Sequence, residues 1–154
     1  MPLVGNRTPR PFLQSSTFNQ AYGQVSPDGR WIAYNSTESG RYEVYVRSVP
    51  APAGKWQISQ GGAVFSRWRG DGKELFYYAA DGRVIAVPIK GETAVEVGAA
   101  TPLFEARMLN GSTPARGFRA QYDVTRDGQR FLINVPLEDT APSPITVVVN
   151  WTAG

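Results

Sequence analysis

Hydrophobic residues occur along the chain in short runs separated by turn residues, among them four Asp-Gly pairs. In residues 42–47 apolar and polar side chains alternate, which predicts a strand. Residues 75–78 and 131–133 are continuously apolar, which predicts strands that are buried on both faces. No segment keeps the roughly 3.6-residue period of an amphipathic helix over helical length, so the pattern predicts an all-β fold.

One motif occurs three times along the chain. It consists of an apolar residue, two further positions, Asp-Gly, a polar residue and a strand rich in aromatic and branched residues. The copies are centred on Asp28, Asp71 and Asp127. Asp-Gly favours a hairpin turn, because Gly adopts positive φ without strain and the Asp side chain can hydrogen-bond the turn backbone. We therefore expect these three aspartates to shape turns rather than to act as catalytic acids or metal ligands.

The spacing of the repeats predicts β-propeller blades. Asp28 and Asp71 are 43 positions apart, close to the roughly 40–45 residues of one four-stranded blade. Asp71 and Asp127 are 56 positions apart, and the excess falls in the Gly-, Ser-, Pro- and Arg-containing stretch 106–119, which we interpret as a loop between blades. The predicted strands are 22–26, 31–35, 42–47 and 55–59 in blade one (22–59), 64–69, 74–78, 83–89 and 102–106 in blade two (63–106), and 120–125, 130–134 and 145–151 in blade three (119–152).

Three blades form an open arc, whereas propellers close with about 4–8 blades. The sequence therefore predicts half of a six-bladed propeller, completed by a second copy of the chain through twofold symmetry. Residues 10–14 have no partner strand in blade one. We expect them to be the outer strand of a preceding blade, or of blade three in the partner. Trp31, Trp68 and Trp151 fall in or beside strands, and we expect them to pack in the core.

Residues 26–34, Ser-Pro-Asp-Gly-Arg-Trp-Ile-Ala-Tyr, resemble the signature of TolB-like β-propeller repeats. Residues 35–50 resemble the next two strands of such a blade, and 67–76 and 125–133 resemble degenerate copies without the Pro. Residues 142–151 resemble the C-terminal end of TolB-like regions attached to bacterial Ser/Thr kinases. The resemblance implies a non-catalytic propeller that binds proteins, senses ligands or accompanies a catalytic domain. A kinase catalytic loop needs a His, and this chain has none.

Composition excludes several kinds of chemistry. The chain contains no Cys and no His, so disulfides, thiol catalysis and Ser-His-Asp triads are excluded. The carboxylates show no paired spacing for acid–base work and no Ca²⁺ loop, so we expect neither a metal nor a cofactor. The net charge of +3 is spread over dispersed arginines, and we expect no nucleic-acid partner. The longest apolar run, 145–149, is too short to span a membrane. The N-terminus lacks a signal-peptide pattern, so we expect a soluble chain of undetermined compartment.

The binding surface is predicted at the rim formed by loops 19–22, 38–41, 60–65, 80–83, 108–119 and 137–143. The candidate binding residues there are Tyr22, Phe65, Arg67, Arg116 and Arg119. The arginines would make a mouth suited to anions, and loop 108–119 is long enough to contribute to binding.

We interpret the chain as a non-catalytic binding or scaffold module that recognises a protein or small ligand through this rim. The alternative is an accessory or sensor domain of an enzyme, such as a Ser/Thr kinase or a prolyl-oligopeptidase-like hydrolase. A third possibility is a small hydrolase or lyase that uses carboxylates and Arg in the channel, and it would require titratable groups clustered there.

Overall fold

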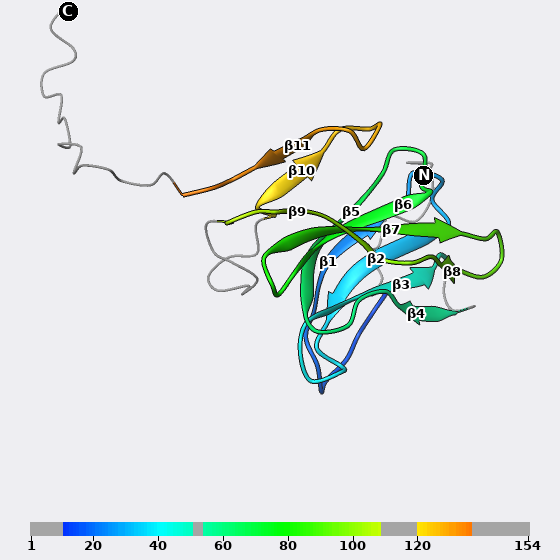
Figure 1. Cartoon of the computed structure of the whole chain (residues 1–154). Helices are drawn as coiled ribbons and strands as arrows, with labels where there is room; N and C mark the ends of the chain where they lie inside the picture. Colours follow the sequence, from blue (N-terminus) through cyan, green and yellow to red (C-terminus); the bar gives the residue numbers. More distant parts are fainter. Residues whose placement is uncertain (1–10, 51–53, 109–119, 137–154) are drawn as a thin grey trace, which may run out of the picture.

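The protein is described by a computed structural model in which residues 11–50, 54–108 and 120–136 are placed. In these ranges every regular element is a β-strand, and the strands form three antiparallel units that follow one another in space (Figure 1). This confirms the predicted all-β fold built from blade-like antiparallel sheets. None of the placed residues belongs to a helix that could cross a membrane.

The first sheet has the strand order β1-β2-β3-β4, as in a propeller blade. Its strands are β1 (Gln20–Val25), β2 (Trp31–Ser36), β3 (Glu43–Ser48) and β4 (Lys55–Gln57). The second sheet has the order β5-β6-β7-β8, and β9 also pairs with β7. Its strands are β5 (Ala63–Trp68), β6 (Glu74–Ala79), β7 (Arg83–Lys90), β8 (Glu96–Val97) and β9 (Thr101–Glu105). Every strand predicted for these two blades is present, and the short β8 is an addition.

The third unit is a hairpin of β10 (Tyr122–Val124) and β11 (Phe131–Ile133). The further strand predicted at 145–151, together with Trp151, lies outside the described residues, as does Arg10. Residues 11–14 form no strand in the single chain. Their predicted pairing with a partner chain stays a prediction.

The three Asp-Gly turns share one hydrogen-bond scheme. In each turn the Gly N–H donates to the carbonyl three residues earlier, and the Asp Oδ1 accepts from the N–H two residues later. The Gly φ values are 74° at Gly29, 72° at Gly72 and 75° at Gly128. The Gly bonds reach Ser26 (2.8 Å), Arg69 (2.9 Å) and Thr125 (2.8 Å), and the Asp bonds come from Arg30 (3.1 Å), Lys73 (3.0 Å) and Gln129 (3.0 Å). The prediction that these aspartates shape turns is confirmed.

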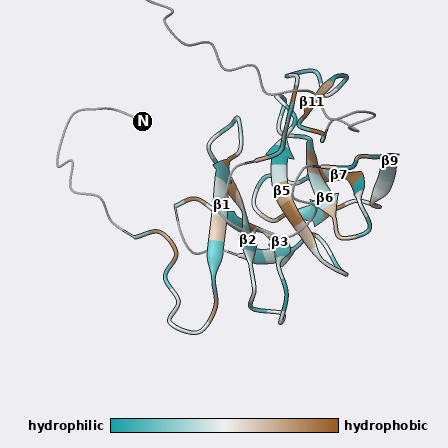
Figure 2. Cartoon of the chain, turned by 90° about the vertical axis from the view of Figure 1, so that its left-hand side faces the viewer, coloured by the Kyte–Doolittle hydropathy of each residue, from teal (hydrophilic) through white to brown (hydrophobic). Residues whose placement is uncertain are grey.

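Two hydrophobic cores hold the sheets together, one on each face of the second sheet. Leu75 and Tyr77 of β6 pack in the core shared with the first sheet, beside Trp31 and Trp68. The alternate residues of β6 pack in the core shared with β10 and β11. Hydrophobic colour is visible on β5 and β7 of the second sheet and at β11 (Figure 2). The continuous apolar run 75–78 thus has both faces buried, as predicted, and Trp31 and Trp68 are core residues. The same prediction is wrong for residues 131–133, because Leu132 is 79% exposed and no further described sheet packs on that face of β11.

A buried carboxylate fixes the connection between the first two sheets. Glu43, at the start of β3, accepts hydrogen bonds from the Gly62 N–H at 2.7 Å and from the Ser59 hydroxyl. Ser59 Oγ in turn accepts from the Val44 N–H at 2.8 Å. A buried carboxylate is stable only when it is hydrogen-bonded in this way. Glu43 therefore ties the β4–β5 loop to the first sheet, a role that the sequence pattern did not indicate.

Candidate functional site

A row of polar side chains links the three innermost strands. Gln24 on β1, Arg67 on β5 and Asp123 on β10 each lie four residues before the Asp of their turn. Arg67 Nε is 3.3 Å from Asp123 Oδ1, and the Gln24 amide can be oriented so that its oxygen accepts from Arg67 Nη1 at 2.8 Å. The Arg67 guanidinium also lies over the ring of Tyr122, 5.8 Å from its centroid. We call Gln24, Arg67 and Asp123 the inner row.

Two predicted binding residues, Tyr22 and Phe65, form an edge-to-face pair with ring centroids 5.0 Å apart. Both have positive φ, 57° and 58°, inside irregular stretches of β1 and β5. Such a conformation is uncommon for a non-Gly residue, and here it recurs at equivalent repeat positions. Phe65 is buried and Tyr22 is half-buried. Burial raises the pKa of Tyr22, Tyr42 adds to this, and Arg67 opposes it.

The structure therefore brings Tyr22, Phe65 and Arg67 into one region on the inner strands. Arg116 and Arg119, with most of the predicted loop 108–119, lie outside the described residues. The predicted anion-binding mouth is placed only in part, and Arg67 already faces an acid within the chain. Binding by these five residues stays a prediction.

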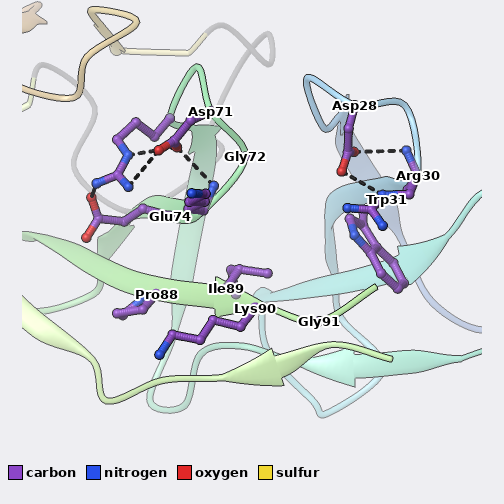
Figure 3. Close-up of a pocket in the computed structure, with 12 residues that line it drawn as sticks. Asp28, Arg30, Trp31, Asp71, Gly72, Glu74, Pro88, Ile89, Lys90 and Gly91 are labelled. Atoms are coloured by element: carbon purple, nitrogen blue, oxygen red, sulfur yellow. Dashed lines mark hydrogen bonds and ion pairs between the residues drawn. The ribbon is translucent and has the colours of Figure 1, made fainter. Parts of the chain in front are cut away.

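A cleft lies at the end of the strands opposite Tyr22 and Phe65, between the Asp-Gly turns of the first and second sheets (Figure 3). We call it the Asp-Gly cleft, and its volume is about 620 Å³. It is lined by Asp28, Arg30, Trp31, Arg69, Asp71, Gly72, Lys73, Glu74, Pro88, Ile89, Lys90 and Gly91. Pro88, Ile89 and the indole of Trp31 supply apolar surface, and the two turns form opposite walls.

The carboxylates of the cleft are paired with arginine. Asp28 Oδ2 lies 2.8 Å from Arg30 Nε. Arg69 donates to both oxygens of Asp71, at 2.8 and 2.9 Å, and to Glu74 Oε2 at 2.9 Å. Lys73 and Lys90 also line the cleft, whose four basic and three acidic side chains leave a net charge of +1. The two arginines offset two of the three negative charges, so the net positive charge of the cleft depends on Lys73 and Lys90.

These contacts keep the turn aspartates ionised. The hydrogen bonds from Arg69 lower the pKa of Asp71 to about 2, although burial opposes this change. Burial tends to raise the pKa of Asp28, but hydrogen bonds from Ser26 and Arg30 outweigh it, and the pKa is lowered. A carboxylate with such a low pKa is a weak proton acceptor near neutral pH.

Asp71 should make stability depend on pH in the acidic range. Because folding lowers its pKa from 3.8 to about 2, ionised Asp71 stabilises the fold above pH 3.8, and this stabilisation is lost as the pH falls toward 2. Asp71→Asn keeps an oxygen for the turn hydrogen bond but loses the ion pair. We expect it to unfold at a lower temperature at pH 6, by an amount worth at most about 1 kcal/mol because the pair is exposed. The difference should become clearly smaller between pH 4 and pH 2 in thermal unfolding followed by circular dichroism.

The matched control is Asp81→Asn. Asp81 makes the same turn hydrogen bond, from the Arg83 N–H at 3.2 Å, but Arg83 contacts Glu105 instead. Its effect should be smaller at pH 6. A difference between wild type and Asp71→Asn that persists unchanged down to pH 2 would contradict the assignment of the ion pair to the ionised carboxylate.

The sequence pattern placed the binding rim at the opposite ends of the strands. In an antiparallel sheet the β1–β2 turn and the β2–β3 loop lie at opposite ends, so the Asp-Gly cleft is not on the predicted rim. A signal for the cleft existed in the repeat itself, which has a polar residue after each Asp-Gly pair. In the first two copies this residue is Arg30 and Lys73, and both line the cleft.

No protein-family model and no curated protein matches this chain. In the placed ranges, His, Cys, Asp and Glu side chains do not gather in any group of three or more that could hold a metal ion.

Proposed function

We propose that this protein is a non-catalytic binding module that holds an anionic group, attached to an apolar group, in the Asp-Gly cleft. The observation that carries the proposal is the distribution of charge in the cleft. Its carboxylates are each held by an arginine, whereas the ammonium groups of Lys73 and Lys90 make no hydrogen bond or ion pair with a described residue. A carboxylate or phosphate would satisfy these donors.

The shape of the cleft supports the same proposal. Its volume of about 620 Å³ lies within the roughly 300–1,000 Å³ typical of ligand sites. Pro88, Ile89 and Trp31 give the apolar part of a ligand a surface to contact. The turn backbones on both sides are fixed by their Asp hydrogen bonds, so little order has to be imposed when the ligand binds.

We further propose that the chain is a TolB-like propeller module. Its support is the repeated turn, in which a Gly of positive φ and an Asp-capped backbone recur with the same hydrogen bonds in all three copies. The resemblance to TolB-like repeats supports a proposal about the fold only, because the shared residues are turn and core residues. Recognition of a ligand is argued from the cleft alone.

The proposal is tested by titrating the ¹⁵N-labelled protein with matched probes. Phenyl phosphate and the peptide N-acetyl-Leu-Glu-amide carry an anion beside an apolar group, and phenol and N-acetyl-Leu-Gln-amide are their neutral counterparts. We expect the anionic probes to shift the amide signals of Gly72 and Gly91. Whichever anionic probe binds more tightly, phenyl phosphate or the Glu peptide, indicates whether the cleft prefers a phosphate ester or an acidic peptide.

The double variant Lys73→Gln/Lys90→Gln should weaken this binding at least about tenfold, because each charge-assisted hydrogen bond is worth about 1.5–3 kcal/mol. Lys55→Gln is the matched control, since Lys55 pairs with Glu38 at 2.6 Å outside the cleft, and its affinity should equal that of wild type. Equal affinity for charged and neutral probes, or no shift with any probe at millimolar concentration, would overturn the proposal.

A further inference from the structure

Two exposed hydrophobic side chains occupy repeat positions that are buried elsewhere in the chain. Val25, three residues before Asp28, is 58% exposed, although its equivalents Trp68 and Val124 pack in the two cores. Leu132, five residues after Asp127, is 79% exposed. Its equivalents Ala33 and Phe76 are buried between sheets.

The exposed positions lie on opposite outer faces. Trp68 and Val124 each face the preceding sheet, so Val25 lies on the outer face of the first sheet. Ala33 and Phe76 each face the following sheet, so Leu132 lies on the outer face of the β10–β11 hairpin. The outer face of the first sheet is therefore of the kind that packs against a preceding sheet, and the outer face of the hairpin is of the kind that packs against a following sheet. Faces of these two kinds pack together inside the chain.

The contact between sheets follows a rule in the repeat numbering. The residue five positions after the turn Asp of one sheet contacts the residue four positions after the turn Asp of the next sheet. Phe76, five after Asp71, contacts Phe131, four after Asp127, with ring centroids 5.2 Å apart. Ala33 and Leu75, which hold these positions in the first and second sheets, share a core. By the same rule, Leu132 would meet an Ile32.

The inner row follows the same order. Gln24 is beside Arg67, and Arg67 is beside Asp123, so the residue next to Asp123 in a continued row would be another Gln24. The Asp123 side chain is 74% exposed and retains capacity to accept a hydrogen bond. A Gln amide can donate to it.

We propose that these outer faces bind a second copy of this chain, so that two copies close head to tail into a six-bladed ring. In the closed ring Leu132 of each copy packs on Ile32 of the other, and Asp123 accepts from Gln24 of the other. A second copy is the occupant that fits both faces, because each outer face has its complementary face at the opposite end of the same chain. Six blades lie within the usual range for closed propellers, and twofold closure leaves no open face.

Cysteine crosslinking tests the proposed contact directly, because the native chain contains no Cys. The variants Ile32→Cys and Leu132→Cys are prepared separately, mixed, and treated with a short bismaleimide. We expect a covalent dimer in the mixture and none with either variant alone. Crosslinking of Leu132→Cys alone would mean that like faces meet, and it would overturn the head-to-tail arrangement. Absence of a crosslink in the mixture would also contradict the proposal.

Solution mass by light scattering provides the second readout. Wild type should have twice the mass of one chain, and Leu132→Lys should have the mass of one chain with unchanged circular dichroism. Leu103→Lys is the matched control, since Leu103 is an exposed leucine on β9, and it should remain dimeric. A monomeric wild type, or an assembly larger than two copies, would overturn the closed dimer. The inference does not depend on the Asp-Gly cleft, and neither substituted leucine lines it.

Discussion

Replacing Phe76 with alanine is expected to lower the free energy of unfolding by about 3–5 kcal/mol, the range observed when a buried aromatic ring is truncated. Phe76 is 1% exposed and lies in the core between the second sheet and the β10–β11 hairpin. Its ring meets Phe131 edge to face, and Phe131 also contacts Phe104 at 5.1 Å. Removing the ring leaves a cavity at the junction that holds the hairpin to the rest of the molecule.

Denaturant unfolding followed by tryptophan fluorescence measures this change. Leu103→Ala is the control, because Leu103 is 42% exposed, and exposed substitutions usually change stability by less than about 0.5 kcal/mol. If Phe76→Ala cost no more than the control, the hairpin would not be held by the second core. A variant too unstable to purify would agree with the expected loss, since the total stability of a domain is only about 5–15 kcal/mol.

Introducing proline at Gly70 is expected to destabilise the protein by about 2–5 kcal/mol, even though it restores the residue that the first repeat carries at Pro27. The Gly70 N–H donates to the Arg126 carbonyl at 2.9 Å, which joins the second Asp-Gly turn to the third. Proline has no N–H, so this acceptor loses its donor, at a cost of about 1–3 kcal/mol. A Cβ at Gly70 would also lie 2.7 Å from the Arg126 carbonyl oxygen, too close for any real contact.

Gly70→Ala separates the two effects, because alanine keeps the N–H and adds only the Cβ. We expect it to cost about 1–3 kcal/mol, as overpacked sites usually do. Thermal and denaturant unfolding of both variants provide the measurement. Proline normally stabilises a compatible turn by about 0.4–1 kcal/mol through the unfolded state. A gain of that size at Gly70 would show that the two turns do not contact each other as described.

The same position explains why the repeats differ in sequence. In the first copy Pro27 occupies the residue before Asp, whereas the second copy has Gly70 and the third has Arg126. The two later turns touch through their backbones, and Gly allows that approach because it lacks a Cβ. The loss of Pro in these copies, which resembled degeneration of the repeat, has a structural cause at Gly70. This cause is visible only in the structure, because the contact between the two turns joins residues far apart in the chain.

The elements of the first two sheets and the three turns could be predicted from sequence because their determinants are local. An Asp-Gly pair selects its turn through the φ of the Gly and the hydrogen bond of the Asp, all within about five residues. The apolar run 75–78 correctly predicted burial on both faces, whereas the run 131–133 did not, because burial of Leu132 depends on what packs against the outer face of the hairpin. The positive φ values of Tyr22 and Phe65 were not predictable. No Gly marks those positions, and both residues lie where the register between two paired strands shifts.

For the candidate site too, some features could be predicted from the sequence and others depend on tertiary structure. The sequence by itself determined that Asp28 and Asp71 belong to turns and that the chemistry of His and Cys is absent. Tertiary structure alone decided that these turns face each other across a cleft, because their separation depends on how the first two sheets pack around Trp31, Leu75 and Ile89. It also decided which lysines line that cleft. Pairing across 43 positions is set by the packing of whole sheets, whereas a turn is set by its own few residues.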